Sequence, residues 1–278
     1  MRRALGRVAI AALCVATLAA GVAGAETPTR RVVRGVAHAK GGKGVAYTQR
    51  EVERWQEGKR VATRVDYRDA KGNKIGFREV RMRGTPLMPE EIFEDLRTGM
   101  RAESRPLRNG RVEVVFRSAK GEDLDRKSFK PDLPPVNGAG VVEAIRAHWG
   151  RLMAGGRVDI ALIVPERLDW YHFRIRKVGT RKRGSHDAVA FVLEPSNPLL
   201  RAVAGQLHFE LDAVSGGLVR YEGRVDLADE DGDPFRIAVA FPAELPGERP
   251  AVAEPRAAAG PGNGAASATP PQPAQPAK

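Results

Sequence analysis

Hydrophobic and polar residues alternate with a period of two through most of the chain between Arg31 and Phe241. Such a run places one set of side chains in a core and the other in water, as an antiparallel sheet with one solvated face requires. This pattern predicts a mainly β (α+β) fold. The apolar positions of the clearest runs are Val61, Thr63, Val65 and Tyr67; Val112, Val114 and Phe116; Leu207, Phe209 and Leu211; Val219, Tyr221, Gly223 and Val225; and Phe235, Ile237, Val239 and Phe241.

Turn sequences separate these runs at short intervals. Asn109-Gly110 is the strongest hairpin signal, because a type I′ turn needs positive φ at both central residues. Lys71-Gly72-Asn73, Ser215-Gly216-Gly217 and Asp231-Gly232-Asp233 mark further hairpins. Successive hairpins give a meander, in which neighbours in sequence are also neighbours in the sheet.

Two segments have helical spacing instead. Residues 89–99 begin with Pro-Glu-Glu, carry an apolar face and end at a glycine, which predicts a short helix. The longer stripe from Val141 to Met153 predicts one amphipathic helix, which has to lie on the concave face of a long antiparallel sheet. The predicted architecture is a single curved antiparallel β-sheet, or half-barrel, with this longer helix on its concave face. Residues 30–243 form one domain.

Both ends of the chain differ in composition from this domain. Residues 1–25 have a basic start, an apolar run from Val8 to Val22 and the sequence Ala23-Gly24-Ala25, which predicts a cleaved export signal. A retained membrane anchor is the alternative, for which the run is slightly short of about 20 apolar residues. Residues 246–278 are dominated by Pro, Ala and Gly, which predicts a disordered tail. We therefore expect a periplasmic or secreted bacterial envelope protein.

The chain is basic, with 46 Lys+Arg against 34 Asp+Glu and a net charge of +12. Removal of Arg2, Arg3 and Arg7 with the signal lowers this charge to about +9, which favours anionic partners such as lipid headgroups. Because the chain is expected to leave the cytoplasm, we do not expect nucleic acid as a partner. The only cysteine, Cys14, leaves with the signal, which excludes disulfides, thiolate catalysis and Cys-ligated zinc from the mature chain.

The segment from Leu168 to Val178 combines aromatic residues on one face with His172 and arginines on the other. Such a strand could bind an acyl chain with its aromatic face and an anionic headgroup with its arginines. The alternative is that one face packs in the core and the other is an ordinary mixed surface. The densest basic cluster overlaps its end, at an expected hairpin tip. It either docks on an anionic membrane or polymer or forms a solvated turn. Its members are Arg174, Arg176, Lys177, Arg181, Lys182 and Arg183.

Motifs for catalysis or metal binding are not found. The acidic run from Asp226 to Asp233 lacks the ligands that an EF-hand loop would need at Leu227 and Ala238. The five histidines have no metal-ligand spacing, and neither H-E-x-x-H nor G-x-S-x-G occurs. We expect a non-catalytic protein without a cofactor or a metal. An unrecognised hydrolase is the alternative, for which His172 and His208 are the residues to change.

The layout resembles that of bacterial envelope proteins similar in plan to the lipoprotein-carrier (Lol-type) half-barrels. The resemblance rests on the export signal, the meander, the mid-chain helix with its Gly-rich exit (145–158), and a late strand pair, residues 207–212 and 217–223. It implies an apolar groove, closed by the helix Val141 to Met153, and a lipid or lipidated ligand. The chain departs from the carriers in its length and its basic, Pro-rich tail. Groove candidates, all of which could instead be core, are Tyr67, Trp149, Tyr171, Phe173, Phe209 and Tyr221.

Two functions follow as expectations. The first is a periplasmic, non-catalytic protein that binds an amphipathic ligand or lipid and supports outer-membrane maintenance. The second is an envelope interaction protein that docks on an anionic membrane or polymer through its basic surface, with binding that weakens as salt increases. The oligomeric state is left open by the sequence.

Overall fold

The computed structural model describes residues 28–39, 44–184, 186–229 and 234–241. The predicted export signal, the predicted tail and the turn 231–233 lie outside these residues. Fifteen strands form one sheet in the order β8-β7-β6-β5-β4-β3-β2-β1-β15-β14-β13-β12-β11-β10-β9. The strands are β1 Thr29–Ala39, β2 Val45–Gln56, β3 Lys59–Arg68, β4 Lys74–Thr85, β5 Met88–Asp95, β6 Arg101–Pro106, β7 Val112–Arg117, β8 Asp125–Phe129, β9 Pro135–Val136, β10 Arg157–Val164, β11 Asp169–Arg183, β12 His186–Pro195, β13 Leu207–Asp212, β14 Leu218–Ala228 and β15 Pro234–Ala240.

The helical elements are short. None of the helices among the described residues is long and apolar enough to cross a membrane. They are α1 Val141–Ala147, α2 Trp149–Met153 and α3 Pro198–Ala204, with 3₁₀ turns η1 Arg108–Gly110, η2 Gly138–Gly140 and η3 Pro165–Arg167.

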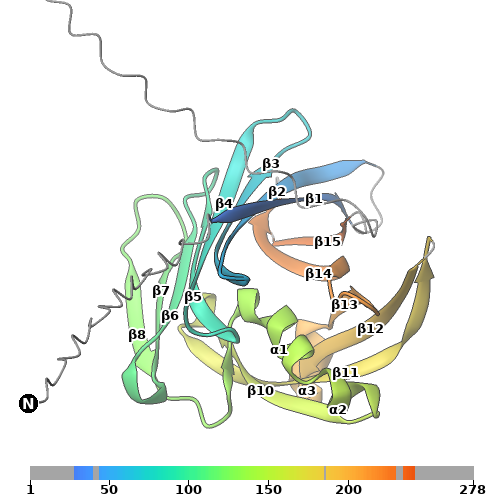
Figure 1. Cartoon of the computed structure of the whole chain (residues 1–278). Coiled ribbons are helices and arrows are strands. Elements are labelled where there is room, and N and C mark those ends of the chain that lie inside the picture. The colour runs from blue at the N-terminus through green and yellow to red at the C-terminus, as the bar shows by residue number, and fades with distance from the viewer. Residues whose placement is uncertain (1–27, 40–43, 185, 230–233, 242–278) are drawn as a thin grey trace, which may run out of the picture.

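The predicted meander is confirmed. Consecutive strands pair antiparallel, except that β8 and β9 lie at opposite edges of the sheet and do not pair, and β9 pairs parallel with β10. Strand β1 pairs with β15, so the first and last strands lie side by side in the middle of the sheet. The sheet curves strongly around α1 (Figure 1), which confirms the predicted half-barrel with helix on its concave face.

The predicted hairpin turns explain the strand order. Asn109 and Gly110 have φ of 60° and 71°, as a type I′ turn requires, and they join β6 to β7. Gly72 and Gly216 also have positive φ, in the turns that join β3 to β4 and β13 to β14. These glycines adopt the left-handed backbone without the steric cost that a side chain would add.

The two ends of the sheet overlap without closing a barrel. Val112 and Val114, on the concave side of β7, pack in one cluster with Met88 of β5 and Ile163 of β10. Ile163 lies on the opposite face of β10 from Ile160, which packs under the helices. The strands β5–β8 therefore cover the outer face of β10, and the sheet is a curved, unclosed roll.

The predicted helix at 89–99 is wrong. The segment forms strand β5 from Met88 to Asp95, followed by a turn with Gly99 at φ 75°. Buried and partly exposed positions alternate along the strand, but Glu91 and Asp95 occupy buried positions. Because acidic residues occupy part of the buried face, the alternation of apolar and polar residues is not visible in the sequence. The same acids resemble those of the first turn of a helix.

The predicted helix from Val141 to Met153 lies on the concave face, but it is not continuous. It divides into α1 and α2 at His148, whose φ of −113° and ψ of 20° are not helical. The side chains of Val141, Ile145 and Leu152 are buried against β10–β13, as the stripe predicted. The apolar stripe therefore identified the buried face, while the break at His148 was not visible in the pattern.

Two apolar clusters fill the concave side. One lies between α1–α2 and strands β10–β13, and Phe191 and Ile145 are fully buried in it. The other lies on strands β1–β5, β14 and β15 and includes Tyr47 and Tyr67. Tyr221 packs against both clusters. The concave face thus has a helix-covered half and a second half built on β1–β5.

Candidate functional site

The second half of the concave face is rich in ionisable side chains. The alternation of side chains along a strand, together with the strand register, puts Glu51, Val65, Arg78 and Phe93 in one row across β2–β5. Glu91 lies in the next row, opposite Val80. This polar surface lies beside the aromatic cluster of Tyr47 and Tyr67, and it is the candidate site.

Arg78 occupies the centre of this surface. Its Nε lies 3.2 Å from Glu91 Oε1, and its Nη2 donates to Asp226 Oδ2 at 2.7 Å. The guanidinium also lies over the Phe93 ring, 5.5 Å from the centroid. The side chain keeps 24% of its exposure and that of Asp226 keeps 46%, so solvent reaches this part of the concave face.

The end of β14 brings Asp226 to this position. The amide of Ala228 donates to Asp95 Oδ2 at 3.1 Å, and Arg97 donates to the Ala228 carbonyl oxygen at 2.6 Å. Arg97 also pairs with Asp95, whose side chain is fully buried. These bonds among Asp95, Arg97 and Ala228 hold β14 against β5 and thereby place Asp226 beside Arg78.

Glu51 differs from the other acids of the surface, because no described residue forms an ion pair or hydrogen bond with its carboxyl group. Burial raises the pKa of Glu51 and the neighbouring Glu53 raises it further, against the opposing effects of Arg60, Arg78 and Arg31. Burial likewise raises the pKa of Glu91, against the opposing effect of Arg78. A half-buried acid without a partner is costly, and a ligand with a hydrogen-bond donor would offset that cost.

Tyrosine rings form the wall next to these acids. Tyr67 makes edge contacts with Tyr47 at 5.6 Å and with Phe93 at 6.1 Å between centroids. Burial raises the pKa of Tyr67 to about 12 and also raises the pKa of Tyr47 and Tyr221, so the three hydroxyls stay protonated at neutral pH. Tyr221 donates to the Arg224 carbonyl oxygen at 2.5 Å. No described residue bonds the hydroxyls of Tyr47 and Tyr67.

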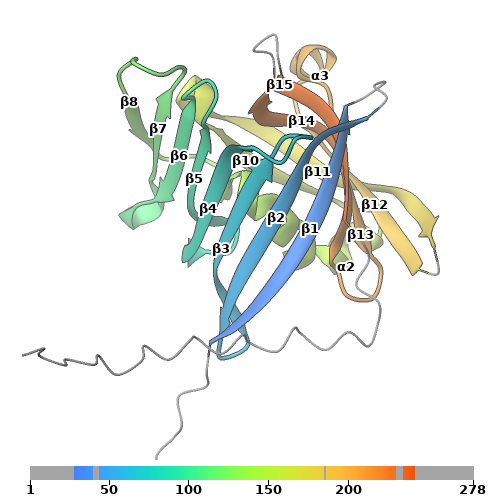
Figure 2. The ribbon, with the colours of Figure 1, turned by 90° about the horizontal axis from the view of Figure 1, so that it is seen from above.

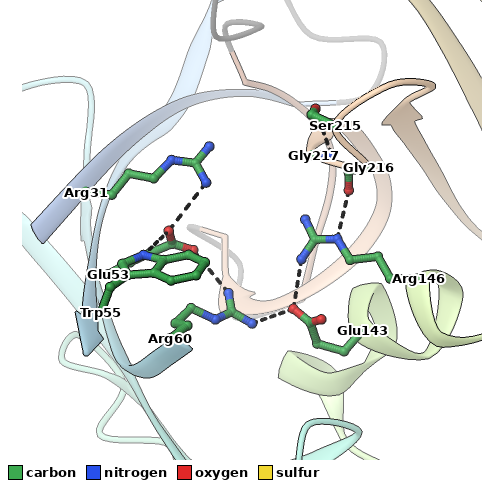
Figure 3. A network of polar contacts seen from close by, with 9 residues as sticks. All are labelled: Arg31, Glu53, Trp55, Arg60, Glu143, Arg146, Ser215, Gly216 and Gly217. Carbon is green, nitrogen blue, oxygen red and sulfur yellow. Dashed lines mark hydrogen bonds and ion pairs between the residues drawn. The ribbon is translucent and has the colours of Figure 1, made fainter. Parts of the chain in front are cut away.

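A polar network joins the helix to the opposite strands across the concave face (Figure 3). Glu53 accepts from Arg60 at 3.1 Å and from the Trp55 indole at 3.0 Å. Arg60 then donates to Glu143 of α1 at 2.6 Å, and Arg146 donates to the same carboxylate at 2.8 Å. The next bond runs from Arg146 to the carbonyl oxygen of residue 216, in the turn between β13 and β14. The network ties α1 to both sides of the curved sheet.

The six predicted groove residues do not line a single groove. Trp149, Phe173 and Phe209 pack in the cluster beneath the helices, where Trp149 contacts Phe191 at 5.3 Å. Tyr67 belongs to the second cluster, and Tyr221 joins the two. Tyr171 is half-buried on β11, opposite Leu162. Of the six, Tyr67 and Tyr221 lie next to the polar surface.

The predicted basic cluster does lie toward the tip of a hairpin, formed by β11 and β12. Most of its cations have carboxylate partners. Arg181 and Arg183 both pair with Glu210, Arg183 at 2.5 Å, and Lys182 pairs with Asp187 at 3.0 Å. The remaining pairs are Arg174 with Asp159 and Arg176 with Glu194, while Lys177 has none among the described residues. Five of the six predicted cations therefore have a carboxylate partner among the described residues.

The residues named for catalysis are dispersed. His172 contacts Asp132 at 2.9 Å, with both side chains exposed, and His208 is exposed opposite Glu222. Within the described ranges, no three His, Cys, Asp or Glu side chains are grouped to hold a metal ion.

Sequence reasoning missed the centre of the site. Glu91 was assigned to a helix, and Asp226 was considered only within an acidic turn. Arg78 and Asp226 are 148 positions apart, so only the register of the sheet brings them together. The available signal was the alternation of Glu51 and Glu53 with valine and arginine on β2, which marks acids on one face.

Comparisons with known proteins find only distant structural similarities. No protein-family model matches the chain, and no curated protein matches it in sequence. A beta-barrel-like protein of the domain of unknown function DUF1849 from Brucella abortus matches 77% of this chain and 94% of its own, with 10% identity and a TM-score of 0.42. A domain described as an outer membrane lipoprotein-sorting protein from Vibrio parahaemolyticus matches 78% of this chain and 86% of its own, with 8% identity and a TM-score of 0.24. Both similarities are distant.

Proposed function

We propose that this protein is a non-catalytic binding protein of the bacterial envelope, which holds an amphipathic or lipid-like ligand on the concave face of its sheet. The observation that carries the proposal is Glu51, a half-buried carboxyl group with no partner among the described residues, beside a wall of tyrosines. The export signal predicted at residues 1–25 supports the envelope as its location.

The aromatic wall suits the apolar part of such a ligand. Tyr47, Tyr67 and Phe93 are buried against one another in the apolar cluster, and tyrosine combines an apolar ring with a hydroxyl that donates a hydrogen bond. The hydroxyls of Tyr47 and Tyr67 are not engaged by any described residue. The apolar chain of a ligand in this place would enter this cluster between the rings, with its polar end near the hydroxyls.

The acids define the polar end. Arg78 is already bound by Glu91 and Asp226, so its charge is neutralised and it offers little to an anionic headgroup. Glu51 instead accepts hydrogen bonds, best from an ammonium or hydroxyl group. The ligand we propose therefore carries an amine or hydroxyl headgroup on an apolar chain.

Native mass spectrometry of the mature protein, purified from a bacterial envelope, tests this proposal. We expect a bound amphiphile that is released on denaturation and that is reduced at least tenfold in Glu51→Ala. Glu57→Ala, in the exposed turn between β2 and β3, is the matched control and keeps the ligand. Protein without any bound amphiphile, in preparations that also fail to bind a hydrophobic dye, would overturn the proposal.

The non-catalytic part of the proposal has a separate test. A broad hydrolase screen of the same protein is expected to give no activity. An activity that is lost in His172→Ala or His208→Ala would show that the protein is an enzyme.

A further inference from the structure

Helix α3 exposes two adjacent leucines at one end of the sheet. It is inserted between β12 and β13 and projects from one end of the sheet (Figure 2). Leu199 is 79% exposed and Leu200 is 42% exposed. The helix is nevertheless anchored, because the Asn197 side chain caps it by accepting from the Leu199 amide at 2.8 Å and Arg201 donates to the Pro195 carbonyl oxygen. A fixed element thus holds apolar side chains in water.

A pocket of about 310 Å³ begins where this helix ends. Gly205 and Gln206, which directly follow α3, form one side of it, and His208, Arg224 and Arg236 contribute to the remainder. The exposed leucines and this pocket therefore belong to one continuous end of the molecule.

The pocket is positively charged. Arg224 and Arg236 are directly opposite each other on β14 and β15, an arrangement that is destabilising for like charges. Neither arginine forms an ion pair with a described residue. Glu222, the acid in the pocket lining, pairs with Arg220 at 3.5 Å. Arg224 attracts Glu166 electrostatically without forming an ion pair, so the two opposed guanidinium groups still favour an anion between them.

We propose that this end of the molecule docks on a bilayer that contains anionic phospholipid. Leu199 and Leu200 enter the interface between headgroups and acyl chains, while Arg224 and Arg236 bind a phosphate group of the same leaflet. Apolar insertion combined with basic residues is the pattern of proteins that lie on a membrane surface.

The cations of the β11–β12 hairpin differ from Arg224 and Arg236, because they form ion pairs within the protein. Arg181, Lys182 and Arg183 were the basic cluster expected from the sequence, yet they have acidic partners within the protein. Arg224 and Arg236, by contrast, form no ion pair with a described residue. This inference is independent of ligand binding at Glu51.

Co-sedimentation of the mature chain with lipid vesicles tests the proposal. Vesicles of phosphatidylglycerol and phosphatidylcholine are expected to bind the protein, and vesicles of phosphatidylcholine alone to bind it much more weakly. Neutralising both arginines, in Arg224→Gln/Arg236→Gln, should weaken binding about thirtyfold, because each cation near an anionic surface contributes about fivefold. The change Leu199→Ser/Leu200→Ser should weaken it by roughly tenfold or more.

Matched control variants distinguish binding at this site from non-specific electrostatic or hydrophobic adsorption to the vesicles. Val214→Ser removes a side chain that is 95% exposed at the other end of β13, and Arg181→Gln/Lys182→Gln removes two cations. Both controls should bind anionic vesicles like the unmodified protein, as should Glu51→Ala. The proposal is overturned if anionic vesicles do not bind, if the arginine and leucine variants bind normally, or if the Arg181 and Lys182 change alone removes binding.

Discussion

Replacing Glu51 by glutamine should stabilise the protein at neutral pH. The pKa of this carboxyl group is raised by burial and by Glu53, above the value of 4.5 of an ordinary glutamate. The folded state therefore holds the proton more tightly than the unfolded chain, and stability falls as pH rises from 4.5 through the raised pKa. Glutamine keeps the shape and carries no charge at any pH.

The size of the effect follows from the surroundings of the side chain. A buried polar group without a partner costs about 1–3 kcal/mol, and Glu51 is only half-buried, so we expect a gain of about 1–2 kcal/mol at pH 7. For a domain of this size that corresponds to a rise in Tm of about 2–8 °C. Below pH 4.5 both states of the unmodified protein are protonated at this position, and the gain should disappear.

Thermal unfolding followed by circular dichroism at pH 4 and pH 7 measures both values. Glu57→Gln, at an exposed position, should change Tm by less than about 1 °C at either pH. A Tm for Glu51→Gln that is equal to or below that of the unmodified protein at pH 7, or a gain of the same size at pH 4, would refute the reasoning.

Further predictions concern the packing and the network on the concave side. Gly140→Ala should cost about 3 kcal/mol or more in the free energy of unfolding, because a Cβ there would overlap the Leu87 carbonyl oxygen. Gly150→Ala, in α2 with open space around it, should instead add about 0.5–1 kcal/mol, and chemical denaturation of both variants checks the contrast. Arg60→Met should cost about 2 kcal/mol, since it removes a charge-assisted bond to Glu143 and one to the buried network behind it. The double change Arg60→Met/Glu143→Gln should cost less than the sum of the two single changes, and additive losses would count against a direct bridge.

The meander was predictable because the turn sequences occur where the runs of alternating apolar and polar residues end. Asn109 and Gly110 supply the positive φ that a tight hairpin needs, and the flanking valines and phenylalanine alternate with charged residues. The curvature also followed, since a single apolar helical stripe from Val141 has only the concave face to cover.

Strand β5 was not predictable by the same reasoning, because its buried face is not apolar. Glu91 and Asp95 are buried through partners that come from distant parts of the chain: Arg78 and the amide of residue 139 for Glu91, and the amide of Ala228 for Asp95. From sequence alone, an acidic residue is predicted to be exposed, because the residues that bind it in the folded protein are not known.

The candidate site was only partly accessible for a related reason. Tyr67 and Tyr221 were identified from their positions on strands, and both lie beside the polar surface. Glu51 and Arg78 become neighbours through the register of three strands, which hairpin lengths and bulges determine. The basic cluster was found in sequence, but its neutralisation by Glu210 depends on β13 lying beside β12.

Site-specific photocrosslinking tests the central claim most directly. A photoreactive amino acid at Gln49 faces the concave side opposite Tyr67, whereas one at the next residue, Arg50, is exposed on the outer face. After irradiation in the bacterial envelope, we predict that mass spectrometry finds an amphiphile attached at position 49 and none at position 50. Equal labelling at the two positions, or labelling at position 50 alone, would contradict ligand binding on the concave face.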